Sequence, residues 1–128
     1  MHTLFIKLLS ITIVISLTAC NKNQPLEQGK ILFQQVHIGK NNVIGCISCH
    51  SLNAQIQTVG PSLSGLGLRA GKLVTDMTAA EYIEQSIINP DAYIVSGYAP
   101  ATMFAHYKTE LTEAEINTLV VFLQNLKN

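Results

Sequence analysis

The residues with the most evident chemistry are two thiols and an imidazole that lie within five positions of one another. Cys46, Cys49 and His50 belong to the stretch Cys-Ile-Ser-Cys-His. A Cys-x-x-Cys pair followed directly by histidine is compatible with three kinds of site: a redox dithiol, a structural zinc site, or the covalent attachment point of a c-type haem.

The rest of the sequence favours the third kind of site. A thioredoxin-like dithiol needs a βαβ unit beside it, and no such strands are predicted. A zinc site needs a fourth ligand, which His37 could supply, but adjacent ligands such as Cys49 and His50 fit a tetrahedron poorly. In haem attachment the two thiols add to the vinyl groups, and the next residue is delivered beneath the iron. The sequence therefore predicts one haem c, bound covalently through Cys46 and Cys49.

Helices must position these residues. The spacing of apolar residues predicts a helix over 26–36, with Pro25 at its first position. Thr78-Ala-Ala-Glu81 is a capping box that predicts a helix ending at Asn89-Pro90. Thr112-Glu-Ala-Glu115 is a second capping box, which opens a helix to Lys127.

Long loops must connect the helices. Segments 37–45, 58–71 and 91–107 are rich in glycine, asparagine or proline. No alternating strand pattern and no repeat is found. The predicted fold class is all-α, with about four helices and long loops wrapped around one bound haem, because so small a chain has a thin core without a cofactor.

The beginning of the chain indicates export. Lys7 precedes an apolar run over 8–17, which is shorter than the roughly 20 residues of a membrane span and fits a secretory signal. Leu-Thr-Ala-Cys, which ends at Cys20, resembles a bacterial lipobox, in which the cysteine is diacylated and becomes the mature N-terminus. The alternative is a plain signal peptide that leaves Cys20 as an odd thiol.

These features predict a signal peptide over 1–19, a lipidated N-terminus and tether over 20–25, and one domain over 26–128. The location predicted is the periplasmic or cell-surface side of a bacterial membrane. Removing the leader, which contains Lys7, leaves seven Lys and Arg against eight Asp and Glu, a net charge near −1. With no basic stripe to neutralise phosphates, nucleic acid is excluded as a partner.

Three motifs together resemble those of a class I monohaem cytochrome c. Besides Cys-Ile-Ser-Cys-His, the sequence Val-Gly-Pro-Ser-Leu-Ser-Gly-Leu over 59–66 resembles the family's proximal loop. The stretch over 81–98, EYIEQSIINPDAYIVSGY, resembles cytochrome c domains of bacterial respiratory chains, including those fused to haem–copper oxidase subunit II. The resemblance covers nearly all of 26–128.

The resemblance implies roles for individual residues. Cys46 and Cys49 form thioethers, and His50 is the proximal iron ligand. The other ring nitrogen of His50 is expected to donate to the backbone carbonyl of Pro61, which fixes the ring. Gly29, Phe33 and Phe122 are expected where the terminal helices cross.

The sixth iron ligand has four candidates: Met77, Met103, His37 and His106. Met103 lies where the family places its axial methionine, after the long loop and before the C-terminal helix. The family usually has proline after this methionine, whereas this chain has Phe104. The change could loosen the loop, and His106 is the natural substitute.

Three further residues are candidates for the haem propionates. Tyr93 and Tyr98 flank the ligand loop and could donate hydrogen bonds, although packing on the porphyrin is equally compatible with a buried tyrosine. Arg69 could pair with a propionate, or could be a solvated surface residue.

The function that the resemblance implies is one-electron transfer, not enzymatic catalysis. A membrane-tethered carrier would exchange electrons with redox-partner proteins, namely a quinol-oxidising complex and a terminal oxidase or reductase. The alternatives are a haem enzyme or gas or redox sensor with a labile sixth ligand, and a fixed haem subunit of an oxidase or reductase complex.

Overall fold

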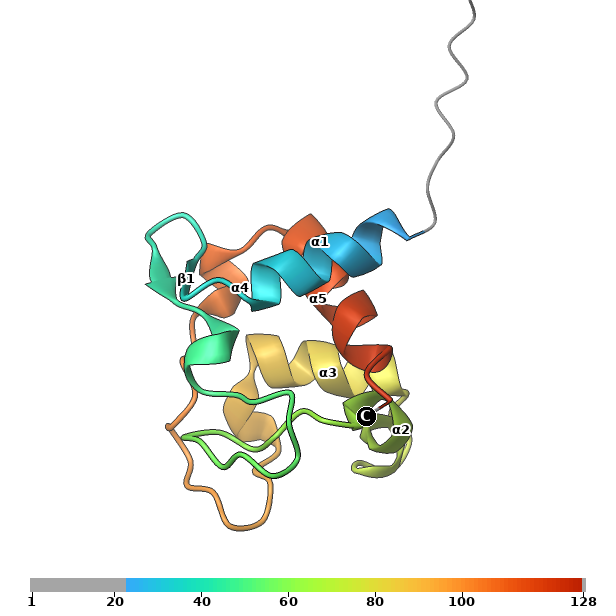
Figure 1. Cartoon of the computed structure of the whole chain (residues 1–128). Helices are drawn as coiled ribbons and strands as arrows, with labels where there is room; N and C mark the ends of the chain where they lie inside the picture. Colours follow the sequence, from blue (N-terminus) through green and yellow to red (C-terminus); the bar gives the residue numbers. More distant parts are fainter. Residues whose placement is uncertain (1–22, 128) are drawn as a thin grey trace, which may run out of the picture.

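Helices dominate the computed structural model, which describes residues 23–127 (Figure 1). The α-helices are α1 Gln24–Phe33, α2 Leu66–Arg69, α3 Ala79–Ile88, α4 Tyr107–Glu110 and α5 Glu113–Gln124. Three 3₁₀ turns cover η1 Cys46–Ser48, η2 Ala70–Lys72 and η3 Pro90–Ala92, and β1 His37–Ile38 pairs antiparallel with β2 Val43–Ile44. The predicted signal peptide and residues 20–22, which include Cys20, lie outside the described residues.

The terminal helices cross at a glycine. A Cβ atom at Gly29 of α1 would lie 1.9 Å from the backbone oxygen of Thr118 in α5, so only glycine allows this approach. Beside it, the rings of Phe33 and Phe122 lie 5.5 Å apart between centroids. The predicted crossing of Gly29, Phe33 and Phe122 is therefore confirmed.

Both capping boxes form as predicted. The Thr78 hydroxyl accepts from the backbone N–H of Glu81, whose carboxylate accepts from the Thr78 backbone N–H at 2.8 Å. Thr112 and Glu115 make the same reciprocal pair. These bonds satisfy N–H groups that have no partner inside the helix, and they fix where α3 and α5 begin. As predicted, α3 stops before Asn89-Pro90.

The helix ends differ from the prediction by a few residues. Helix α1 begins two residues earlier, with Pro25 at its second position, and ends at Phe33 rather than at Val36. Helix α5 ends at Gln124 rather than at Lys127. Apolar spacing marks the buried face of a helix but not the residue at which its hydrogen bonds end.

Two predicted loops contain regular structure. Segment 58–71 holds α2, which follows the left-handed Gly65 (φ 64°) and packs on the end of the chain, where the Gly67 N–H donates to the Leu126 carbonyl at 2.9 Å. Segment 37–45 holds the β1–β2 hairpin, whose strands of two residues are too short to show an alternating pattern. Both α2 and the hairpin are held in place by contacts with residues far away in the sequence.

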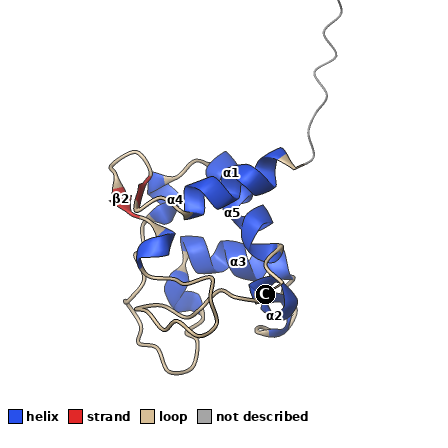
Figure 2. Ribbon diagram, viewed as in Figure 1, coloured by secondary structure: helices blue, strands red, loops and turns tan. Residues whose placement is uncertain are grey.

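The all-α fold class is confirmed: the described residues form five α-helices, of which α2 and α4 have only four residues. Side chains of α1, α3 and α5 supply most of the core, including the almost fully buried Phe33, Ile83 and Leu119. Long loops gather beyond α3, on the side away from α1 (Figure 2). Within 23–127, no helix has the length and apolar character to cross a membrane.

Candidate functional site

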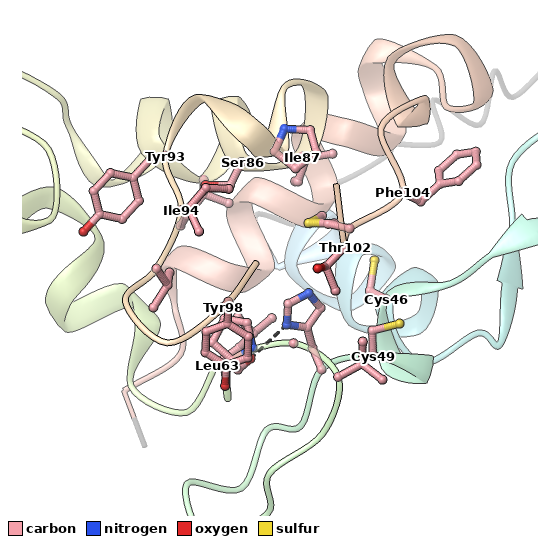
Figure 3. Close-up of a pocket in the computed structure, with 18 of the residues that line it drawn as sticks. Cys46, Cys49, Leu63, Ser86, Ile87, Tyr93, Ile94, Tyr98, Thr102 and Phe104 are labelled. Carbon is pink, nitrogen blue, oxygen red and sulfur yellow. Dashed lines mark hydrogen bonds between the residues drawn. The ribbon is translucent and has the colours of Figure 1, made fainter. Parts of the chain in front are cut away.

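A cavity of about 470 Å³ opens between the loops and α3 (Figure 3). This volume lies in the usual range for sites of small ligands and cofactors. The eight residues predicted to bind the haem or its iron all contribute to its wall. These residues are Cys46, Cys49, His50, Pro61, Arg69, Tyr93, Tyr98 and Met103.

The remainder of the wall is mostly apolar. Helix α3 contributes Ile83 and Ile87, helix α5 contributes Leu123, and the segment before α2 contributes Leu63. Such a wall excludes water and lowers the local dielectric, which suits a large apolar ring system with one polar edge. The cavity is thus a fitting site for the haem that the motif predicts.

The imidazole of His50 is held by the loop that follows it. Its Nδ1 lies 2.9 Å from the Pro61 carbonyl oxygen, which can only accept, so Nδ1 carries the proton and Nε2 keeps its lone pair. Burial lowers the pKa of His50, and the hydrogen bond to Pro61 opposes that shift. A neutral, oriented imidazole is the form that binds a metal ion.

Gly60 leaves the room that this arrangement needs. A Cβ atom there would lie 2.5 Å from Cε1 and 2.8 Å from Nδ1 of His50. Its own N–H donates to the Cys49 carbonyl at 2.7 Å, which also accepts from the Thr58 hydroxyl at 2.6 Å. Gly60 is part of the proximal-loop motif, but its close approach to the imidazole became evident only in the structure.

Cys46 begins the 3₁₀ turn η1, and Cys49 directly follows its last residue. The N–H groups of Cys49 and His50 both donate to the Cys46 carbonyl, at 3.1 Å and 3.0 Å. Burial raises the pKa of the Cys46 thiol to about 11, opposed by a backbone hydrogen bond and reinforced by Cys49. Both thiols are free of a disulfide and face the cavity, on the side opposite Tyr93 and Ile94 in Figure 3.

The two other interpretations of the motif find no support. The only sheet formed by residues 23–127 is the short hairpin, so the dithiol has no βαβ unit beside it. No group of three or more His, Cys, Asp or Glu in that part of the chain could hold a metal ion, so a fourth-ligand partner such as His37 does not join the cysteines.

Of the four candidates for the sixth ligand, Met103 alone lines the cavity. His37 is exposed on β1, and His106 is exposed at the beginning of α4. Met77 immediately precedes the capping box of α3 and is not part of the cavity wall. Met103 and His50 reach one cavity from loops 53 positions apart in sequence.

The three propionate candidates differ in how they are held. The Arg69 guanidinium donates to the carbonyl of Ser62 at 2.7 Å and to that of Ser64, so it braces the proximal loop as well as lining the cavity. Tyr93 packs edge-on against Tyr82, with centroids 5.7 Å apart. Tyr98 is half-buried in the wall. Their hydrogen bonds to propionates stay a prediction.

Tyr107 is a wall residue whose role the sequence did not indicate. Tyr107 is buried, and its hydroxyl donates to the Ile44 carbonyl at 2.8 Å, two residues before Cys46. Burial raises the pKa of Tyr107, and the two cysteines add to the shift, so the hydroxyl stays a donor at neutral pH. No local pattern marks such a residue, because its partner lies 63 positions away.

Comparison with protein families gives one match. The family model described as Cytochrome c matches residues 26–127, which include the whole cavity wall. The family binds haem c covalently through a Cys-x-x-Cys motif, and Cys46 and Cys49 have that spacing. A search of the curated proteins found no match.

Proposed function

The chain belongs to the cytochrome c family, and from that premise we propose that it is a membrane-tethered electron carrier of a bacterial respiratory chain. The iron would be held between His50 and Met103. The observation that carries this proposal is that these two side chains line one apolar cavity with both cysteines, while the other candidates for the sixth position lie outside it.

The residues of the cavity supply what an electron carrier needs. When bound, haem c supplies an iron that gains and loses one electron. The neutral imidazole of His50 is oriented by Pro61, and the soft thioether of Met103 favours the ferrous state, which raises the reduction potential. With His50 and Met103 both holding the iron, no site would remain for a substrate, and the apolar wall would limit rearrangement of water when the charge changes.

The cellular setting is proposed from the N-terminal sequence. Lipidation of Cys20 would hold the domain on the periplasmic or cell-surface side of the membrane, since several acyl chains at about 0.8 kcal/mol per buried CH₂ give stable anchoring. The redox partners would be a quinol-oxidising complex and a terminal oxidase or reductase. Because carrier and partners would share one membrane surface, weak docking would be enough for electron transfer. Fractionation of cells tests this: Cys20→Ser should move the protein from membranes to the soluble fraction.

Docking is expected beside the attachment turn. The 28 residues from 41 to 68 contain no Asp, Glu, Lys or Arg. Within them, Ile44 and Val59 line the cavity and are 42% and 59% exposed. A redox partner would therefore meet an uncharged, partly apolar surface near Cys46 and Cys49, the two residues that would hold the haem.

The ligand assignment is tested by the visible spectrum of the oxidised holoprotein. A sulfur–iron bond gives a weak far-red band, which should be present in the parent, absent in Met103→Ala and retained in Met77→Ala, the matched control. Reversible one-electron voltammetry of the parent should accompany it. If the parent lacks the band and its ferrous form binds carbon monoxide, the sixth position is labile and a haem enzyme or sensor is the better assignment.

A further inference from the structure

We propose that Phe104 and Tyr107 are positioning residues for the Met103 thioether, because they tie the loop that carries it to the segment that carries Cys46. This inference rests on the proposed ligation by Met103. Phe104 stands where the family usually has a proline that stiffens the loop, so another contact must hold the loop in this chain.

The ring of Phe104 makes two aromatic contacts. It packs edge-on against Tyr107, with centroids 5.0 Å apart and planes at 67°, and against His106, with centroids 5.6 Å apart and planes at 80°. Edge-to-face pairs at these distances are attractive. Phe104 and Tyr107 both line the cavity, whereas His106 does not. The residue after Met103 is thus immobilised by packing instead of by a proline ring.

Tyr107 connects Phe104 with the segment that precedes Cys46. Tyr107 is 4% exposed, and its hydroxyl donates to the Ile44 carbonyl at 2.8 Å. Ile44 is the last residue of β2, and one residue separates it from Cys46. One aromatic contact and one hydrogen bond therefore connect the Met103 loop with the attachment turn.

The far end of α4 is tied to the same hairpin. The Glu110 carbonyl accepts from the Lys40 N–H at 3.1 Å, and its carboxylate accepts from the backbone and side-chain amides of Asn41 at 3.1 Å and 2.9 Å. A helix of four residues has no stability of its own, so these contacts hold α4 in place. Helix α4, which we call the strut, therefore links the β1–β2 hairpin to the loop that carries Met103.

The other side of Met103 is held separately. The Ala101 N–H donates to the Asp91 carboxylate at 2.9 Å, and Ala101 has a φ of 55°, a conformation that is unfavourable for alanine. Because Ala101 is held in a strained conformation, we expect it to contribute little to fixing Met103. The contacts of Phe104 and Tyr107, which follow Met103, would then resist displacement of the thioether.

The test compares ligand release with global unfolding in the holoprotein. In Phe104→Ala the far-red band should be weakened, and carbon monoxide should bind the ferrous form about tenfold more tightly, as expected for the loss of an aromatic pair. Tyr107→Phe, which keeps the ring and removes only the hydroxyl, should give about a threefold change, as for one lost hydrogen bond. Phe104→Tyr keeps an aromatic ring at this position and should retain the far-red band of the parent.

Thr78→Ala is the control for a purely structural effect. It removes the cap of α3, away from the strut, and should lower the guanidinium midpoint while leaving the band and carbon monoxide affinity unchanged. If Phe104→Ala and Tyr107→Phe also leave both unchanged, the inference is wrong although Met103 ligation stands. If the parent itself has no band, or Met103→Ala keeps it, the proposed ligation fails first.

Discussion

The two sides of the haem cavity are built on different principles. The proximal side, which carries His50, is braced by hydrogen bonds within a short stretch of chain: Nδ1 to Pro61, and the Cys49 carbonyl to Gly60 and Thr58. The distal loop, which carries Met103, has few such bonds and depends on contacts with α4. A ligand fixed by its own neighbours survives disturbances elsewhere, whereas a ligand fixed by tertiary packing is lost with that packing.

Glycine substitutions should separate the two sides most strongly. In Gly60→Ala the new methyl would collide with the His50 ring. We therefore expect the free energy of unfolding to fall by about 1–3 kcal/mol and the yield of holoprotein to be poor. In Gly97→Ala, on the distal loop, no atom lies within 4 Å of the new methyl, and only the φ of 90° costs about 1 kcal/mol. Guanidinium unfolding of both variants, followed by far-UV circular dichroism, measures the difference. Equal losses would contradict the contrast.

Denaturant should release the two proposed iron ligands one after the other, Met103 before His50. Because Met103 depends on α4 and His50 on its own loop, the far-red band of the oxidised parent should disappear at a lower guanidinium concentration than the helical signal. Protein that has lost the band but kept its helices should still show a histidine-ligated haem. A single coincident transition in all signals would mean that both sides unfold as one unit.

Acid should produce the smallest effect, and one that is common to both sides. Hydrogen bonds from the Thr78 side chain and backbone lower the pKa of Glu81 below its usual 4.5. The stability that Glu81 contributes is therefore present above pH 4.5 and is lost as the pH falls through its lower folded-state value. Glu81→Gln should flatten this acid loss, with Glu84→Gln on the same helix as control. Because α3 lines the cavity through Ile83 and Ile87, Glu81→Gln should move the acid midpoints of the far-red band and of the helical signal by the same amount. An unchanged acid profile in Glu81→Gln would contradict the prediction.

The local chemistry of the site could be predicted from the sequence alone. The attachment turn, the Pro61 contact and both capping boxes join residues within 11 positions of one another, so their partners can be recognised in a short motif. The crossing at Gly29 was also predictable, but only through the family resemblance, since its partner Thr118 lies 89 positions away.

Which side chains share the cavity could not be predicted locally, because it depends on how the whole chain folds. Four residues could have completed the iron ligation by type, and the fold brings one of them, Met103, to the cavity wall. It also revealed α2, the hairpin and the role of Tyr107, whose contacts reach across the chain to Leu126, α4 and Ile44. Short elements of this kind have no periodic pattern, because their order comes from long-range contacts that form only when the whole chain has folded.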